Sequence, residues 1–256
     1  MYDMNYLIAK NKTNFQKLCS DLDFEIDTLD ELKSDMVSCF NQLNPQLVNA
    51  FCYHPEDNTI SQNIGSDRLS LGIDYIGPSR YYAEKRGLSD LQILTFSLYT
   101  RELGGHLIFP TKRYPAGNNY KSLNEIRSYR FKERIDYFLF ELKQWYLGKN
   151  RVNAAKAVLE GNRKWFEQFS NFEGYIDCFR MNDFVNTEYE PYDLASCEGA
   201  RYRRVITEHP DLSYGGSYSV KLERAYIPED YSAYIEGCTN AILQRTRRLR
   251  SKFTKL

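Results

Sequence analysis

Histidine, paired cysteine and the common phosphate-binding and catalytic motifs are scarce or missing in this sequence. Three isolated histidines, His54, His106 and His209, make a histidine-rich metal site unexpected. Six cysteines occur without a C-x-x-C pair, which argues against a zinc knuckle or a disulfide framework and predicts reduced core thiols. No G-x-x-x-x-G-K-[ST], G-x-G-x-x-G, H-E-x-x-H or G-x-S-x-G is present. We therefore expect no cofactor and no metal, although a Mg²⁺ site made of carboxylates alone would fit the composition.

Long apolar runs and an excess of charge of either sign are also missing. No run approaches the roughly 18 to 20 residues of a membrane span, and the start MYDMNYLIAKNKTNF lacks the apolar stretch of a signal peptide. We therefore expect a cytoplasmic protein that has no membrane partner. The formal net charge is zero, which removes the simplest argument for nucleic-acid binding, because nonspecific DNA binders usually carry a basic excess.

The charges that are present lie unevenly along the chain. Residues 21–35 hold seven acids and one Lys, whereas residues 245–256 hold six bases and no acid. Both runs are interpreted as solvated helix faces or, alternatively, as binding surfaces. If the basic run faces nucleic acid, its contacts come from Arg245, Arg247, Arg248 and Arg250.

Aromatic residues are abundant, at 15% of the chain, and 21 of them are Tyr and 15 are Phe. Tyrosine has a flat apolar face and a polar tip, which suits the stacking of bases or sugars. The same residues are also ordinary core and subsurface packing. Composition does not decide between these two uses.

The spacing of apolar residues predicts a chain dominated by helices. Within residues 131–148, apolar side chains recur every three or four positions and Gly148 follows as a stop. Ser89 is the expected N-cap of one helix, and Pro228 is the expected first residue of another. Similar spacing predicts helices in NFQKLCSDLDFEI, DELKSDMVSCFNQL, SDLQILTFSLYTREL, NAAKAVLEGNRKWFEQF and PEDYSAYIEGCTNAILQRTRRLRSKF.

Strand patterns are fewer and shorter, and they do not alternate regularly with the helices, which disfavours a doubly wound parallel sheet. No repeat or low-complexity linker is visible. We therefore predict an α+β fold, an α-rich single domain with a small sheet, over residues 1–256, with a basic C-terminal helix at 240–256. The expected strands are RLSLGI at 68–73, HLIFP at 106–110, RYRRVIT at 201–207 and a hairpin in DLSYGGSYSVKL.

Two glycine-containing stretches combine turn formers with polar side chains. In GIDYIGPS, residues 72–79, Asp74 and Ser79 belong either to a capped turn or to a site in which the turn holds an exposed carboxylate for water activation or ligand binding. In RELGGHLIFP, residues 101–110, the ordinary interpretation is a helix C-cap followed by a strand. The alternative is an anion site: the glycines admit a ligand to the backbone, and a cation and a titratable ring lie beside them. Its residues would be Arg101, Gly104, Gly105 and His106.

Two further stretches place acids beside arginines. In residues 122–136, Asn124 and Arg127 lie three apart, and Arg134 precedes Asp136; surface ion pairs and a phosphate- or base-binding site both explain this pattern. In residues 173–186, Asp177 and Asp183 lie in an apolar context, so at least one acid should sit near the core boundary with an arginine partner. A structural salt bridge and an active-site acid remain open.

In order, IGPS, LGGHLIFP, LNEIR, ERIDYFLFELKQWY and WFEQFSNFEGYIDCFRMNDFV resemble a family of uncharacterised bacterial and phage proteins grouped under a domain-of-unknown-function label. The resemblance covers residues 70–190. Ser122, Ile126 and Glu133 depart from the family's Thr, Ala and Asp, and the second half of its D-R-x-D-L-T-L motif is poorly kept. The matching positions are residues 76–79, Gly104, Gly105, His106, Phe109, Pro110, Asn124, Arg127, Arg134, Asp136, Phe172, Gly174 and Asp177.

The resemblance implies an association with antiphage defence, including enzymes similar to DNA glycosylases that remove modified bases. We therefore expect a nucleic-acid-directed hydrolase that cleaves an N-glycosidic bond, acting on DNA or a nucleotide, with Asp74, Asp136 or Asp177 as its acid/base. Two alternatives are a non-catalytic sensor that binds the same ligands and a structural protein without a ligand. The oligomeric state is not indicated. The expected substrate-binding residues are Ser79, Arg101, Gly104, Gly105, His106, Asn124, Arg127 and Arg134.

Overall fold

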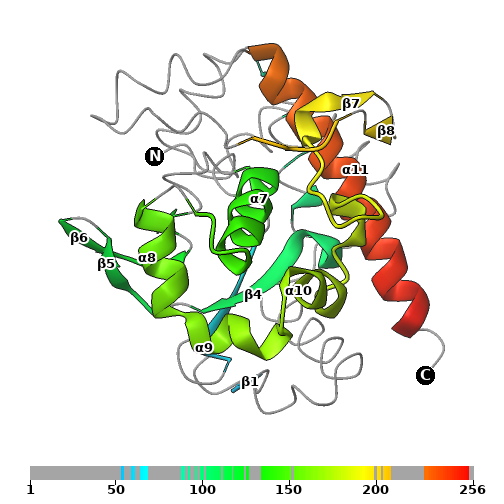
Figure 1. The fold of residues 1–256 in the computed structure, drawn as a ribbon. Coiled ribbons are helices and arrows are strands. Elements are labelled where there is room, and N and C mark those ends of the chain that lie inside the picture. Colours follow the sequence, from blue (N-terminus) through cyan, green and yellow to red (C-terminus); the bar gives the residue numbers. More distant parts are fainter. Residues whose placement is uncertain are drawn as a thin grey trace.

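A computed structural model describes a little over half of the chain, mainly its second half (Figure 1). The chain between Arg68 and Arg134 is described in shorter pieces. The described residues are 53–54, 59–60, 64–68, 88–89, 92, 96, 99–100, 102–110, 112–116, 118–123, 125–126, 134–150, 153–198, 201–202, 204–208 and 228–253.

Helices and short antiparallel sheets make up the described part, which confirms the α-rich α+β fold class. One sheet has the order β1-β2-β3-β4, and two further sheets are the pairs β5-β6 and β7-β8. The strands are β1 Tyr53–His54, β2 Thr59–Ile60, β3 Ile64–Arg68, β4 His106–Pro110, β5 Tyr114–Ala116, β6 Asn119–Lys121, β7 Cys197–Glu198 and β8 Arg201–Tyr202. The helices are η2 Leu103–Gly105, α7 Ile135–Tyr146, α8 Asn153–Gly161, α9 Arg163–Phe166, η3 Glu167–Phe169, α10 Phe172–Cys178, η4 Asn182–Phe184, η5 Leu194–Ser196 and α11 Pro228–Phe253.

The predicted strand at 106–110 is confirmed as β4, which pairs along its whole length with β3 from Ile64↔Pro110 to Arg68↔His106. Of the strand predicted at 68–73, only Arg68 is described, and it ends β3. The strand predicted at 201–207 is observed only as β8, at Arg201–Tyr202. Among the described residues that follow it, Val205 makes an isolated bridge to Tyr192. The predicted hairpin DLSYGGSYSVKL lies outside the described residues.

Local sequence rules account well for the helix ends. Gly148, with φ +69°, follows α7 as predicted, because this left-handed conformation strains any residue that has a Cβ. Ser89 forms a capping box: its Oγ accepts the backbone N–H of Gln92 at 3.2 Å, and its own N–H donates to Gln92 Oε1 at 2.9 Å. Helix α11 begins at Pro228 and spans the whole predicted segment. The helices predicted in residues 14–26 and 30–43 lie outside the described residues.

The predicted helix NAAKAVLEGNRKWFEQF is divided into α8, α9 and η3. The break is at Asn162, whose side chain donates to the Val158 carbonyl at 2.8 Å while its backbone N–H is shared between Val158 and Leu159. A side chain that bonds to a nearby carbonyl competes with the regular helical ladder, and this is why asparagine disfavours helix interiors. The chain therefore turns here, although its apolar spacing continues.

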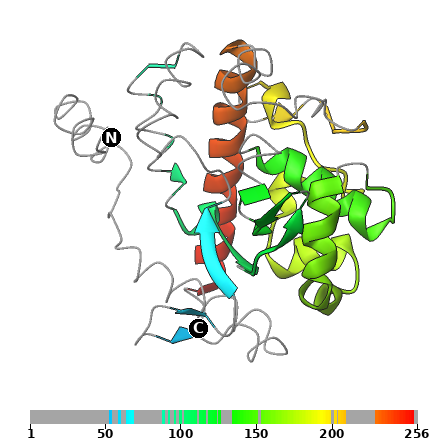
Figure 2. The same ribbon diagram turned by 90° about the vertical axis from the view of Figure 1, so that its left-hand side faces the viewer.

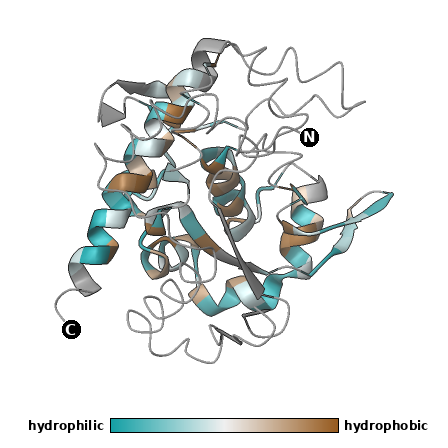
Figure 3. Cartoon of the chain, turned by 180° about the vertical axis from the view of Figure 1, so that it is seen from behind, coloured by the Kyte–Doolittle hydropathy of each residue, from teal (hydrophilic) through white to brown (hydrophobic). Residues whose placement is uncertain are grey.

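Many aromatic residues of the second half are core packing. Trp145, Phe166, Phe169, Tyr175 and Phe179 are buried, and their rings meet edge-on or tilted, with centroids 5.6 Å apart for Trp145–Phe166, 5.3 Å for Phe169–Tyr175 and 4.9 Å for Tyr175–Phe179. These geometries suit the quadrupoles of aromatic rings. Hydrophobic residues accordingly colour much of α7 and α8 in the view from behind (Figure 3), and many of them are buried, among them Phe138, Leu142 and Val158.

Helix α11 forms one long side of the molecule, and η2, η4 and η5 pack against it (Figures 1 and 2). Its inward residues Tyr234, Cys238, Ile242 and Leu249 are 0% exposed, which places this helix in the main core. The long C-terminal helix is therefore a structural wall as well as the carrier of the basic run.

Candidate functional site at the junction of α10, η4 and α11

The two glycines of the RELGGHLIFP stretch pack against other parts of the chain. The Gly104 N–H donates to Thr246 Oγ1 at 2.9 Å, and a Cβ on Gly104 would lie 2.6 Å from the Thr246 nitrogen. A Cβ on Gly105 would lie 2.5 Å from the Thr100 carbonyl oxygen. Glycine is thus required because η2 approaches α11 and Thr100 closely. The expected role of these glycines, to admit a ligand to the backbone, is corrected to close packing within the protein.

Arg245 is also internal, which corrects its expected position on a nucleic-acid surface. The side chain is 0% exposed. Its Nε and Nη2 donate to the Phe179 carbonyl at 3.0 and 2.8 Å, and its Nη1 donates to the carbonyls of Gly104 and His106, each at 2.7 Å. One guanidinium thereby joins α11 to the end of α10 and to the start of β4. His106 itself is 1% exposed, so its ring lies inside the protein.

The remaining arginines of the basic run face outward. Arg247 and Arg250 are exposed, and Arg248 is partly exposed. Arg248 Nη2 lies 2.6 Å from Asp183 Oδ1, and Arg250 Nη2 lies 3.4 Å from Glu102 Oε2. The basic surface expected from the sequence is therefore reduced by one residue, and on one side it borders the η4 turn.

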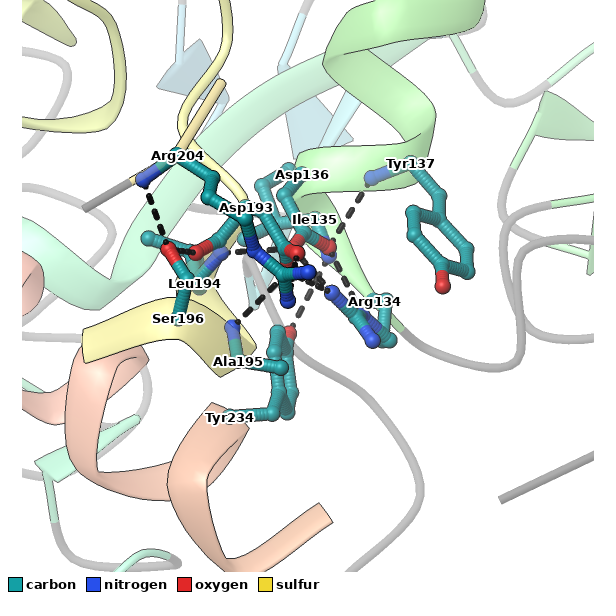
Figure 4. A network of polar contacts seen from close by, with 10 residues as sticks. All are labelled: Arg134, Ile135, Asp136, Tyr137, Asp193, Leu194, Ala195, Ser196, Arg204 and Tyr234. Atoms are coloured by element: carbon teal, nitrogen blue, oxygen red, sulfur yellow. Dashed lines mark hydrogen bonds and ion pairs between the residues drawn. The ribbon is translucent and has the colours of Figure 1, made fainter. Parts of the chain in front are cut away.

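Arg134 and Asp136 form a buried ion pair at the start of α7 (Figure 4). The Arg134 guanidinium donates through Nε at 3.0 Å and through Nη2 at 2.5 Å to the two Asp136 oxygens, and Nη2 also lies 2.9 Å from Asp193 Oδ1. The Tyr137 ring lies 4.0 Å from its central carbon. A bidentate pair stacked on an aromatic face fixes the arginine in one orientation.

The Asp136 carboxylate has no oxygen left for a substrate. Besides Arg134, Oδ1 accepts the Tyr137 N–H at 2.9 Å and Oδ2 accepts the Leu194 N–H at 2.9 Å, and the residue is 1% exposed. Asp193 extends the network outward, because its Oδ2 lies 2.9 Å from Arg204 Nη2. With four N–H donors on two oxygens, Asp136 holds α7 to η5, and this arrangement favours a structural role over the expected acid/base role.

Asp177, in contrast, is half-buried and is oriented by neutral groups. It lies in the last turn of α10, where Asn182 Nδ2 donates to Oδ1 at 3.0 Å and the Tyr189 hydroxyl lies 3.2 and 3.0 Å from the two oxygens. The hydrogen bond to Asp177 and the negative charge of that carboxylate raise the pKa of the Tyr189 hydroxyl above its ordinary value. This carboxylate is fixed in direction and still reaches solvent.

Tyr189, one of the two residues that orient Asp177, is itself held in an uncommon backbone conformation. Tyr189 has φ +56°, in the left-handed region that residues with a Cβ rarely adopt. Lys143 of α7 fixes the turn by donating to the Tyr189 carbonyl at 3.0 Å and to Glu190 Oε1 at 2.6 Å. Strained backbone that is held by its surroundings is concentrated at functional sites. The turn therefore marks Asp177 more strongly than its spacing in the sequence does.

Asp183 lies within η4, five residues after the end of α10, and is the acid expected near the core boundary. Its side chain is 4% exposed, and Oδ1 pairs with Arg248 as described above; within the described residues Oδ2 has no hydrogen-bond partner. Burial raises the pKa of the Asp183 carboxyl above its ordinary value, and the charges of Arg248 and Arg245 partly oppose that rise.

We expect Asp183 to make the protein less stable as pH rises through the acid range. Because the raised pKa means that the native state binds this proton more tightly than the unfolded chain, the free energy of unfolding falls as pH rises above about 3.8, the ordinary Asp value. Asp183→Asn should flatten this slope in urea unfolding measured over a pH series. Glu188→Gln removes an exposed carboxylate from a nearby turn and is the control. A slope that Asp183→Asn leaves unchanged would contradict the assignment.

The structure therefore brings some of the predicted residues together and separates others. The carbonyls of Gly104 and His106 accept hydrogen bonds from Arg245, with Gly105 between them in the chain, and η4 links Asp177 to Arg248 through Asn182 and Asp183. Arg134 and Asp136 belong to the separate network with Asp193. Asp74, Ser79, Arg101, Asn124 and Arg127 lie outside the described residues. Sequence reasoning missed Tyr189, Asp193 and Arg204, whose partners are distant in sequence and leave no local pattern.

The described part of the chain contains neither a cluster of metal ligands nor a membrane-spanning helix. No group of three or more His, Cys, Asp or Glu side chains there could hold a metal ion. Among the described helices, none is both long enough and apolar enough to cross a membrane.

A family model described as a family of unknown function (DUF6994) matches residues 3–249. The chain belongs to this family. DUF6994 carries no assigned activity, so membership supports the resemblance to an uncharacterised domain family and adds no reaction. No curated protein and no solved structure matches the chain.

Proposed function

We propose that this protein is a cytoplasmic nucleic-acid-directed hydrolase that cleaves the N-glycosidic bond of a base, with modified phage DNA as its substrate and antiphage defence as its role. The observation that carries the proposal is the Asp177 carboxylate, which is half-buried and oriented by Asn182 and Tyr189. It lies on a turn that is tied through Asp183 to the basic outer face of α11.

The chemistry requires few groups. Water attacks C1′ of the sugar, the C1′–N bond breaks, and the base leaves with the electron pair and takes up a proton. A carboxylate beside C1′ orients the water and accepts its proton, or stabilises the positive charge that develops on the sugar. Asp177 is suited to this because its two donors fix its direction while leaving lone pairs available. Neither a metal nor a cofactor is part of this reaction.

The outer face of α11 supplies the affinity for the polymer. Arg247, Arg248 and Arg250 lie within one helical turn of each other, as contacts to consecutive phosphates require. Arg248 is paired with Asp183, so that a phosphate which binds Arg248 acts directly on the turn that orients Asp177. Phosphate binding is thereby joined to the candidate carboxylate by the Arg248–Asp183 ion pair and by the hydrogen bond from Asn182 to Asp177.

We expect Asp177→Asn to reduce the formation of abasic sites by about 100-fold, the size of effect usual for a positioned acid or base. Purified protein is incubated with unmodified DNA and with genomic DNA from phages that carry modified bases, and alkali-induced strand breaks report abasic sites. Glu173→Gln removes another half-buried carboxylate from α10 and serves as the matched control, with activity expected within about twofold of wild type, as for a residue outside the reaction.

The same experiment separates the hydrolase from a non-catalytic sensor. Binding of DNA by the wild type without release of any base would replace the proposal with the sensor. Equal activity of Asp177→Asn and wild type would remove Asp177 from the reaction. Absence of binding at low salt, where phosphate contacts are strongest, would overturn the nucleic-acid assignment itself.

A further inference from the structure

A two-stranded ribbon, β5-β6, extends away from α8 at the edge of the molecule, and its residues are largely hydrophilic (Figures 1 and 3). One large side chain breaks that pattern: Tyr120 on β6 is 63% exposed. Tyrosine that is merely structural is usually half-buried with its ring packed, whereas this ring is turned to solvent from a polar ribbon. An exposed aromatic of this kind is available to a ligand that has a flat face.

The ribbon is braced at its base on both strands. The Tyr114 ring of β5 packs so closely on Gly161, the last residue of α8, that a Cβ there would clash with it. On β6, the Tyr120 carbonyl accepts a hydrogen bond at 3.0 Å from Nη2 of Arg113, which directly precedes β5, and the same nitrogen donates to Glu125 Oε1 at 2.9 Å. Tyr120 is therefore presented on a fixed scaffold, so its immobilisation costs little when a partner binds.

The charge of the ribbon indicates which partner fits. The segment KRYPAGNNYK, residues 112–121, contains three cations, two tyrosines and no acid. Lys112 and Arg113 are exposed, and Lys112 Nζ lies 5.4 Å from the centre of the Tyr114 ring. Glu125, at the base, offsets part of this charge through Arg113 and Lys121. Cations interleaved with aromatic rings match a polymer of phosphates and bases, since the cations hold the backbone and the ring stacks on a base.

We propose that the β5-β6 ribbon is a nucleic-acid-binding arm and that Tyr120 stacks on an exposed base. The inference rests on the proposed function for the identity of the polymer, and it adds a second contact surface that is separate from α11. A base becomes accessible in single strands, in bulges, and beside a nucleotide that has been extruded for chemistry. Tyr120 therefore confers a preference for nucleic acid with an unpaired or extruded base over fully paired duplex.

The test compares the affinities of three proteins for two probes by fluorescence anisotropy. The proteins are wild type, Tyr120→Ala and Tyr120→Phe, and the probes are a fluorescein-labelled DNA duplex with one unpaired thymine and its fully paired counterpart. We expect Tyr120→Ala to weaken binding of the bulged duplex roughly 5- to 150-fold, the range measured for loss of one stacked base, and Tyr120→Phe to remain within about twofold. Leu147→Ala, which removes another exposed apolar side chain, controls for surface apolarity and should bind as wild type does.

The outcomes separate this inference from the proposed function. Equal affinity of wild type and Tyr120→Ala for the bulged duplex would overturn the stacking role, even if the wild type produces abasic sites. A Tyr120-dependent preference for the bulge without abasic sites would support the arm and reject the hydrolase. Equal binding of both duplexes by wild type would also overturn the inference, because stacking on an unpaired base predicts a preference. Circular dichroism melting of each variant verifies folding, which the removal of an exposed ring should leave intact.

Discussion

Arg245→Met should lower the free energy of unfolding by about 3 to 5 kcal/mol, as expected when one partner of a buried charged hydrogen-bond network is removed. Methionine retains much of the aliphatic volume but none of the donors. The carbonyls of Gly104, His106 and Phe179 would then lie inside the protein without the guanidinium that they share. Urea unfolding followed by far-ultraviolet circular dichroism measures the change in midpoint and slope.

Arg247→Met is the matched control for this result. It makes the same substitution two residues further along the same helix, at an exposed position, and should change stability by no more than about 0.5 kcal/mol. If both variants lost the same small amount, Arg245 would not be the cross-link that its hydrogen bonds indicate. The two variants also separate folding from binding. If Arg245→Met is the destabilised variant, any loss of its affinity for DNA follows from the loss of structure.

Asp136→Ala should have an effect of similar size, about 3 to 5 kcal/mol, because it leaves a buried guanidinium short of its main partner. The substitution also removes the acceptor of the Tyr137 and Leu194 N–H groups. Its measurement distinguishes the two interpretations of this residue. If Asp136 is a structural anchor, its substitution lowers stability strongly. If it acts only as an acid in catalysis, its substitution lowers activity and leaves stability nearly unchanged.

Asp177→Ala provides the comparison, since that aspartate accepts neutral side-chain donors and is half-buried; a loss of about 1 kcal/mol is expected. A double-mutant cycle between Arg134→Met and Asp136→Leu then isolates the pair itself. Two apolar side chains of similar size often replace a buried ion pair with little loss, so the double variant should be more stable than Asp136→Leu alone. Strictly additive losses would show that the two side chains do not interact.

The elements that sequence reasoning predicts well are those set by neighbours in the chain. Helix α11 has the predicted bounds, because Pro228 fixes its start and its apolar spacing is continuous. The Ser89 cap and the Gly148 stop are likewise decided within three or four residues. The same rules missed the break at Asn162, where one side-chain hydrogen bond outweighs the spacing of the apolar residues.

The site could be predicted only in part, because its contacts join residues that are far apart in sequence. The sequence indicates an acid near the core boundary in residues 173–186, and Asp183 is such an acid, but nothing local indicates that its partner is Arg248. The sequence pattern indicates Arg134 and Asp136, which lie two residues apart. Their structural role, however, depends on Asp193, which is 59 residues from Arg134, and on Leu194, which is 58 residues from Asp136. Arg245 looks like its exposed neighbours in the sequence and differs from them only by the direction in which it points.

The docking of η2 onto α11 also governs when the protein can fold during synthesis. The contacts that Gly104 makes with Thr246 and Arg245 close loops of 142 and 141 residues. Native contacts of such long sequence separation form late and slow the folding rate. The nascent chain therefore exposes the apolar residues that α11 covers in the folded protein until ribosomal synthesis has passed residue 246. During that interval the chain needs protection from aggregation.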